Sequence, residues 1–498
     1  MSPRQPIAAA LPAGIFAILV FVAVNETDRQ PPARPAPPPP RIGEAAEDRQ
    51  AATPSSSHRP SWNAPTIALP VTAVGTCRVI ENRRTGNARR GTLVSIPDGQ
   101  PDARVVVAWR NDRWMATTHG LVTGDYEIQG TGNGTPTVTS ASAGLDCATT
   151  HHGDADADGL VDEPAPPAAP AAPDADGITV LDTLVVFNES ARIALGGSAA
   201  NPADDDAIRL KIASSVAAAN SAYADSEIPI ALRLLFAGPV DYPYPTTENF
   251  SRALSELTVS DDGKLDAVEQ LRDAYGADIV SLWLSSDTSG GLARVIRPLT
   301  LRFRSAFSVV RAENPVTTFV HEVGHNLGCR HLESSYATTP TSWFPDSFAH
   351  FFTTPSGRKY VTLMASTSDI NTTGADARIL RFSDPSLTYE EGVTGSTGQS
   401  DCARTLRASG PREAQFFPFS PGALHVVPLA SGSSLSMEGA FPNRSYAIER
   451  SAGLDGWSPL DISLTTSESG DSTSPATVPG TPVPLSVDSF FRATLEPQ

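Results

Sequence analysis

Residues Thr317–His331 read TTFVHEVGHNLGCRH, and this stretch decides the fold class and the chemistry of the chain. Asn314, just before it, can cap a helix, and apolar residues follow at helical spacing. On that helix His321 and His325 are four residues apart, so both imidazoles project from one face. Glu322 lies beside them in the sequence and points in a different direction.

Gly328 predicts the end of this helix, because glycine adopts the left-handed conformation at low cost. The chain then turns, and His331 returns as a third imidazole beside His321 and His325. Three imidazoles with an open fourth position form a catalytic zinc site, in which Glu322 can act on an activated water molecule. The alternative, three solvated or core histidines, is disfavoured because three of only nine histidines fall within eleven residues.

The whole pattern resembles the H-E-x-x-H-x-x-G-x-x-H motif of the metzincin zinc metallopeptidases. Members of that family have a methionine turn beneath the zinc, and Met364, one of only four methionines, stands 33 residues after His331. An ordinary core methionine is the other interpretation of Met364. Further segments resemble bacterial members of the reprolysin (adamalysin-like) group, namely DTLVVF at 182–187, YGADIVSLWL at 275–284, AFSVV at 306–310 and RILRFSDP at 378–385.

The resemblance covers residues 177–410, about half of the chain, and it has departures. Leu332 stands where those relatives usually have an aspartate. Ser366 stands where astacin- and serralysin-like relatives carry the tyrosine that adds a metal ligand, so that ligand is not expected here. No departure touches the three histidines or Glu322. A neighbourhood in which many relatives carry extra cysteines is occupied here by Gly290, Gly291 and Ala312.

The resemblance implies an α/β (α+β) catalytic domain with a mixed sheet and a zinc helix, acting as an endopeptidase on proteins or peptides. One catalytic zinc would be held by His321, His325 and His331. Glu322 would take a proton from the attacking water and pass it to the leaving amine. An extended substrate would pair with an edge strand of the sheet by backbone hydrogen bonds. The strand that the resemblance assigns to this role contains Gly291, Leu292 and Ala293.

Two rival functions belong to other classes. A cell-surface binding or adhesive protein could retain an inactive metzincin fold, but binding alone does not need the three histidines and Glu322 together. A zinc enzyme that acts on a non-peptide bond is the second rival, and only the edge-strand resemblance argues against it. The sequence therefore favours a zinc endopeptidase.

Strands and helices alternate through residues 177–418, which predicts one α/β catalytic domain. Residues 61–150 before it show short strands between glycine, asparagine and aspartate turns, and resemble the β-rich propeptide domain of these proteases. Residues 419–498 show only strands, typical of a small Ig- or fibronectin-like β-sandwich. In the catalytic region we expect strands at 181–187, 230–236, 278–284, 291–296 and 306–310, and helices at 204–224 and 265–275.

Charge and the N-terminal segment bear on partners and location. A formal net charge of −18 argues against a nucleic-acid binder, which needs a basic face. Arg4 precedes an apolar run, Ile7–Val24, so residues 1–24 are a cleaved signal peptide or an uncleaved transmembrane anchor. Either interpretation places the rest of the chain outside the cytoplasm, secreted, periplasmic or tethered to the cell surface. Residues 25–60 form a Pro-rich linker.

The cysteines suggest how a latent precursor could be held. Cys147 ends the β-rich domain, and its thiolate could occupy the open zinc position. A disulfide between Cys147 and Cys77 is the alternative, favoured by export to an oxidising compartment. Cys329 and Cys402 lie in the catalytic region and are expected to pair.

A second linker, residues 151–176, is acidic and rich in Pro and Ala. It contains the D-x-D-x-D-G pattern of a calcium loop, but Ala165 stands where the bidentate glutamate is needed. A weak calcium site and a solvated acidic linker both fit this segment, which is also a preferred kind of site for proteolytic nicking. The candidate calcium ligands are Asp154, Asp156, Asp158 and Asp162.

Overall fold

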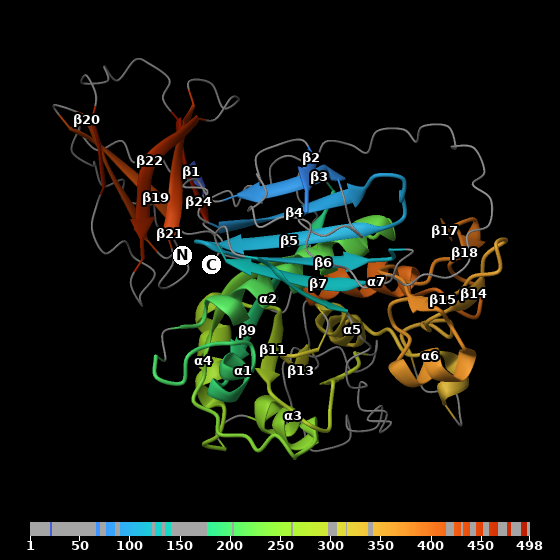
Figure 1. The fold of residues 1–498 in the computed structure, drawn as a ribbon. Coiled ribbons are helices and arrows are strands. Elements are labelled where there is room, and N and C mark those ends of the chain that lie inside the picture. The colour runs from blue at the N-terminus through green and yellow to red at the C-terminus, as the bar shows by residue number, and fades with distance from the viewer. Residues whose placement is uncertain are drawn as a thin grey trace, which may run out of the picture. The chain divides into compact units, whose positions relative to one another are not determined.

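The chain separates into two compact units, one of residues 29–418 with 497–498 and one of residues 1–28 with 419–496 (Figure 1). Outside the first unit, the computed structural model describes residues 20–21 and short stretches between 423 and 495. Within the first unit it describes residues 66–69, 76–84, 90–121, 125–131, 135–140, 177–201, 204–259, 262–296, 306–314, 316–336 and 342–414.

A five-stranded mixed sheet forms part of the first unit, in the order β10–β9–β11–β13–β12. The first four strands are parallel neighbours, whereas β12 runs antiparallel to β13 at the edge. Every residue of β11 is buried, as expected for a strand covered on both faces. This is the mixed sheet that the sequence predicts. Its strands are β9 (Thr179–Phe187), β10 (Ile230–Pro239), β11 (Ile279–Leu284), β12 (Gly291–Ala293) and β13 (Phe307–Arg311).

Two helices, α2 (Asp206–Asp225) and α5 (Val316–Asn326), pack against each other. α5 also contacts β12 and β13, and α2 contacts β10. The sequence predicts both helices to within about two residues at each end, which is the usual ambiguity of helix boundaries. The other helices before α5 are α1 (Glu189–Ala194), α3 (Phe250–Thr258) and α4 (Asp266–Tyr275).

The sequence pattern misses α1 and α3, because both are short and begin at an asparagine cap instead of a long apolar repeat. Asn188 accepts a hydrogen bond from the backbone N–H of Ala191, and Asn249 accepts one from that of Ser251. Such caps satisfy backbone donors that the first helical turn leaves unpaired. Side-chain caps therefore define these two helices more than periodicity does.

A seven-stranded sheet precedes the catalytic region in the same unit, in the order β2–β3–β4–β5–β6–β7–β8. Each strand pairs antiparallel with the next one along the chain. The β-rich character predicted for this region is present in the structure. Its strands are β2 (Thr66–Ala68), β3 (Thr76–Arg84), β4 (Arg90–Pro97), β5 (Arg104–Arg110), β6 (Arg113–His119), β7 (Tyr126–Thr131) and β8 (Thr137–Ser140).

His119 in this sheet predicts a pH-dependent stability. Burial lowers the pKa of His119 from 6.5 to about 4, so the unfolded chain binds the extra proton between these values. Stability is therefore lost as the pH falls from about 6.5 to about 4, by about 2–3 kcal/mol at pH 4.5. Asp125 has the opposite dependence, because burial raises its pKa to about 7. Because the two effects overlap, the contribution of His119 is obtained by comparing the stability of wild type with that of His119→Gln at each pH.

The measurement is urea unfolding followed by tryptophan fluorescence, since Trp109 and Trp114 are buried in the same sheet. His119→Gln should become more stable relative to wild type when the pH is lowered from 7 to 4.5. Parallel pH dependences of the two proteins would contradict the assignment. Asp125→Asn serves as the companion variant, and its difference from wild type should appear on raising the pH from 4 to 7.

The chain after α5 folds back beneath that helix in a series of short elements. Leu363 and Met364 lie in the turn between Val361, where β15 ends, and Thr367, where α6 begins. Both side chains are fully buried. The elements are η4 (Glu333–Ser335), β14 (Phe351–Thr353), β15 (Lys359–Val361), α6 (Thr367–Thr373), β16 (Ala377–Arg378), β17 (Thr388–Tyr389), β18 (Gly392–Val393) and α7 (Cys402–Glu413).

The second unit contains two antiparallel sheets. One has the order β1–β19–β20–β23 and the other the order β22–β21–β24. The all-β character expected after residue 418 is present among the described residues, and the sandwich packing stays a prediction. The strands are β1 (Val20–Phe21), β19 (Ala423–Leu429), β20 (Gly432–Glu438), β21 (Ser445–Ser451), β22 (Ser458–Thr465), β23 (Ala476–Pro479) and β24 (Phe490–Leu495).

The cysteine pairing expected in the catalytic region is wrong. Cys329 and Cys402 are both buried free thiols. Cys329 Sγ lies 3.7 Å from the carbonyl oxygen of Cys402, so the two residues are neighbours without a bond between their sulfur atoms. Cys77 is buried, and burial raises the pKa of its thiol to about 11. Its bond to Cys147 stays a prediction. Cys147 itself lies outside the described residues.

The structure bears little on the N-terminal segment. No helix among the described residues is long and apolar enough to cross a membrane. Of the apolar run Ile7–Val24, only Val20 and Phe21 are described, as the short strand β1 that pairs with β19.

Candidate active site

The three histidines of the motif converge on one point. The Nε2 atoms of His321 and His325 are 3.0 Å apart, those of His325 and His331 are 3.0 Å apart, and those of His321 and His331 are 3.1 Å apart. All three side chains are buried. Four-residue spacing on α5 brings the first two together, and Gly328, with φ of +97°, makes the turn that returns His331.

Backbone carbonyls fix which nitrogen of two rings carries the proton. His321 Nδ1 lies 3.1 Å from the carbonyl oxygen of Leu363, and His325 Nδ1 lies 2.8 Å from that of Cys329. A carbonyl oxygen only accepts hydrogen bonds, so each Nδ1 donates and each Nε2 keeps its lone pair. This is the arrangement that orients histidine ligands at metal sites.

The rings of His321 and His325 are neutral at ordinary pH. Burial above all, followed by the charges of His325, His331 and Arg378, holds the pKa of His321 well below its usual range. Burial and the charge of His331 have the same effect on the pKa of His325. Converging neutral nitrogen lone pairs repel one another unless a cation lies between them, so this donor set fits a zinc ion with three protein ligands.

Glu322 is fully buried and lies against the edge strand. A Cβ atom placed on Gly291 of β12 would be 2.1 Å from Glu322 Oε1 and 2.6 Å from its Cδ. Asn326, one turn along α5, donates to the carbonyl oxygens of Arg294 at 3.0 Å and Phe307 at 2.8 Å. These bonds hold α5 against β12 and β13, and the missing side chain at Gly291 leaves the space that the carboxylate occupies.

Met364 lies directly beneath the helix that carries the histidines. A Cβ on Gly324 would be 2.3 Å from Met364 Sδ and 3.2 Å from its Cε, and Met364 is fully buried. The carbonyl oxygen of the neighbouring Leu363 accepts the hydrogen bond from His321. The backbone N–H of Leu363 donates to the carbonyl oxygen of Arg381, which holds this part of the turn in place. The methionine thus supports the turn that orients His321.

We expect Gly324→Ala to weaken zinc binding about 10–100-fold, the range typical of disturbed outer contacts of a metal ligand. The added methyl group must displace Met364 and with it the Leu363 carbonyl. Competition with a coloured chelator measures the zinc affinity. Adding Met364→Ala should restore part of it by removing the clash, and an unchanged affinity in Gly324→Ala would contradict this role of the turn.

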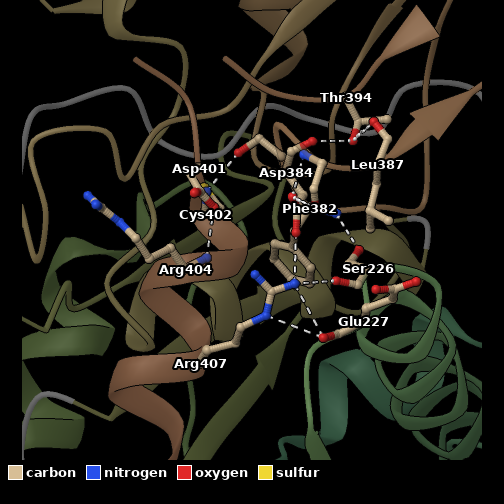
Figure 2. Close-up of polar contacts among 12 residues, drawn as sticks. Ser226, Glu227, Phe382, Asp384, Leu387, Thr394, Asp401, Cys402, Arg404 and Arg407 are labelled. Carbon is tan, nitrogen blue, oxygen red and sulfur yellow. Dashed lines mark hydrogen bonds and ion pairs between the residues drawn. The ribbon is translucent and has the colours of Figure 1, made fainter. Parts of the chain in front are cut away.

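The segment after the methionine turn is held from below by an ion pair and backbone contacts (Figure 2). Arg407 Nη2 on α7 donates to Asp384 Oδ2 at 2.7 Å and to the carbonyl oxygen of Ser226 at 3.2 Å. The backbone N–H of Phe382 donates to Ser226 Oγ at 2.9 Å. Phe382 stacks on Tyr223 of α2 with ring centroids 5.5 Å apart. The underside of the site is therefore tied to α2 and α7.

The structure brings together the three histidines, Glu322, Met364 and the edge strand, all of which the sequence singles out. The sequence pattern did not indicate Gly324, Leu363 or Arg378 as site residues. A glycine inside a helix is unfavourable by about 1 kcal/mol relative to alanine, so a glycine at position 324 suggests that another part of the chain packs closely there. This signal in the sequence could have identified Gly324. The proposed latency thiol Cys147 and the calcium candidates Asp154, Asp156, Asp158 and Asp162 lie outside the described residues.

Comparison with known proteins points to the same region. Residues 180–383 match the model of metallo-peptidase family M12, Reprolysin_5. A Pseudomonas aeruginosa protein named peptidyl-Asp metalloendopeptidase is 29% identical over 268 residues, covering 48% of this chain and 40% of that protein. Proteins of the same name are 28% identical in Xanthomonas campestris, covering 45% of this chain and 48% of that protein, and 26% identical in Stenotrophomonas maltophilia, covering 45% and 49%.

The chain spans less than half of the length of each of these relatives. The matched region begins within β9 and ends just before Asp384. It includes the histidine triad and the turn beneath it. Residues 180–383 are therefore similar to the reprolysin-like metallopeptidases of family M12.

Proposed function

We propose that this protein is a zinc-dependent endopeptidase in which Glu322 is the general base. The observation that carries the proposal is the convergence of three buried imidazole nitrogens within 3.1 Å of one another, next to a buried carboxylate. The names of the similar proteins agree with a metalloendopeptidase. Zinc bound there would act as a Lewis acid on the scissile carbonyl and lower the pKa of the attacking water.

The chain's own residues supply positioning and proton transfer. His321 and His325 are pre-oriented by the carbonyls of Leu363 and Cys329, so little reorganisation is needed on binding a metal. Glu322 takes the proton from water at a carboxylate oxygen and delivers it to the leaving amine. Gly291 leaves that carboxylate unobstructed, and β12, at the edge of the sheet, pairs with the extended peptide.

The substrate class that we propose is a peptide with an aspartate at the cleavage site. The relatives are named for action at peptidyl-Asp bonds. Arg378 is placed to favour such a side chain: it pairs with Val361 of β15, two residues before the Leu363 that orients His321. Its positive charge is also one of the smaller causes that lower the pKa of His321.

The test uses two peptides that differ only in one aspartate or asparagine at the cleavage site. Wild type should cleave the aspartate peptide at least about 10-fold better in kcat/KM, which corresponds to about 1.4 kcal/mol. Arg378→Gln should reduce this preference, whereas Arg252→Gln, at an exposed position on α3, should leave it unchanged. Equal cleavage of both peptides by wild type would contradict the substrate class but not the peptidase.

We further propose that the enzyme is exported and made as a latent precursor. The apolar run after Arg4 supports export, and the position of Cys147 between the seven-stranded sheet and the catalytic region supports a thiol that blocks the zinc. Cys147→Ala should then raise the activity of the uncut chain several-fold over wild type. Equal activities of the two proteins would count against the thiol.

A further inference from the structure

Helix α2 is buried on all sides, which is unusual for a helix that covers one face of a sheet. Such a helix normally has one apolar stripe and one polar face. In α2 the buried side chains include Leu210, Lys211, Ser214 and Val216, which spread around the helix axis. β10 lies on one side of the helix, and strands β5 and β6 of the seven-stranded sheet lie on another (Figure 1). The sequence of α2 therefore suits a place between two sheets.

Apolar residues of the seven-stranded sheet complete the hydrophobic core around α2. Val94 on β4 and Val106 on β5 belong to the same buried cluster as Ile208 and Ile212. The neighbours of Val106 on β5 belong to a separate cluster, as expected because strand side chains alternate between faces. One face of the sheet thus contributes to the core of the catalytic region.

Ion pairs fix β5 along the full length of α2. Arg110 Nε lies 2.5 Å from Asp206 Oδ1 at the start of the helix. Arg104 Nη2 lies 2.7 Å from Asp225 Oδ1 at its end. These pairs hold both ends of β5, so the strand and the helix run in opposite directions with a fixed register.

A buried ion pair occupies the middle of the same interface. Lys211 is only 1% exposed and pairs with Glu127 of β7. Removing one partner from such a pair leaves an uncompensated charge in a place that water reaches poorly, which strongly destabilises a protein. Near it, Thr117 Oγ1 lies 3.5 Å from Ser214 Oγ of α2 and 3.2 Å from His119 Nε2. Polar groups of α2 and of the seven-stranded sheet therefore pair with one another, as their apolar side chains pack together.

The sheet also contacts the segment that follows the methionine turn. Arg381 Nη2 lies 3.1 Å from Asp102 Oδ1. A Cβ on Gly120 would be 2.5 Å from the hydroxyl oxygen of Tyr389, so these two residues touch closely. Arg381 is the residue whose carbonyl receives the hydrogen bond from the backbone of Leu363. The sheet thus helps to hold the chain that supports the site.

We propose that residues 66–140 are a permanent subunit of the enzyme, which stays bound to α2 without a covalent link after the linker 151–176 is cut. Shedding the sheet would expose the apolar second face of α2 and separate Lys211 from Glu127. A propeptide that only blocks an active site needs no such interface. The mature enzyme is accordingly a two-chain complex whose N-terminal chain completes the catalytic core.

The test uses the full chain carrying Glu322→Gln, so its outcome does not depend on catalysis or on the proposed function. A recognition sequence for a site-specific protease replaces residues 165–170 of the linker. After cutting, both fragments should elute together on size exclusion at 0.15 M and 0.5 M salt, with one copy of each by native mass spectrometry. Separation of the fragments at 0.15 M salt would overturn the proposal.

Two further measurements guard against a variant that fails to fold. In the cut protein, amide hydrogens of α2 should stay as protected from exchange as in the uncut chain, and their exposure on cutting would overturn the proposal. The double variant Arg104→Asp/Arg110→Asp places like charges beside Asp225 and Asp206 and should weaken the cut complex at least about 10-fold. Arg78→Asp, at an exposed position on β3, should not, and equal stability of the two cut variants would contradict the interface.

Discussion

Replacing Glu322 by glutamine should lower the rate of peptide cleavage by about 10²–10⁴-fold, the range that general acid–base catalysis contributes. Glutamine keeps the size of the side chain but cannot accept a proton from the attacking water. The three imidazoles and their carbonyl partners are untouched, so the zinc content should equal that of wild type. The measurement is kcat/KM on a peptide substrate, with zinc determined on the same sample.

Glu333→Gln is the matched control, since Glu333 is exposed and lies two residues after His331. It makes the same chemical change close to the site and should leave cleavage within about twofold of wild type. If Glu322→Gln retained more than a tenth of the wild-type rate with a full complement of zinc, Glu322 would not be the general base.

The second large effect is expected from a single methyl group at Gly291. A Cβ there would be 2.1 Å from Glu322 Oε1, so Gly291→Ala must push the carboxylate away from its place. The clash involves the end of a flexible side chain, and the fold should therefore tolerate the change. A displacement of about 1 Å at a catalytic group lowers rates by about 100-fold, which is the loss that we expect in kcat.

Gly357→Ala is the control for this variant, because a Cβ at Gly357 meets no atom within 4 Å. Because Gly357 has φ of +88°, alanine is mildly strained there. Gly357→Ala therefore shows how much a glycine-to-alanine change costs when no neighbouring side chain is displaced. Both variants should keep their zinc, and only Gly291→Ala should lose activity. An active Gly291→Ala would show that Glu322 does not need the space beside the edge strand.

The sequence predicts the histidine triad well because its geometry is local. A spacing of four on a helix, followed by a glycine turn, determines where His321, His325 and His331 point. The alternation of strands and helices predicts the mixed sheet for a similar reason, since each strand is a short apolar run. The family resemblance added Met364 and the edge strand, which lie far from the motif in the sequence.

Long-range features could not be predicted in this way. The bond expected between Cys329 and Cys402 is absent although the two residues are neighbours, because proximity alone does not provide the geometry that a disulfide needs. The sequence predicts a helix at 204–224, but not that a second sheet would bury its other side. Small residues of that helix gave no hint of this, because alanine and serine suit exposed and buried helix positions alike.

The proposed activity depends on one zinc ion held by His321, His325 and His331 beside Glu322. The most direct test is elemental analysis of the purified full chain by mass spectrometry, with His331→Ala measured beside it. His350→Ala serves as the control, because His350 lies outside the triad and packs on Phe352. We predict one equivalent of zinc in wild type and in the control, and less than a tenth in His331→Ala. Zinc-free wild type after loading, or undiminished zinc in His331→Ala, would contradict this zinc site.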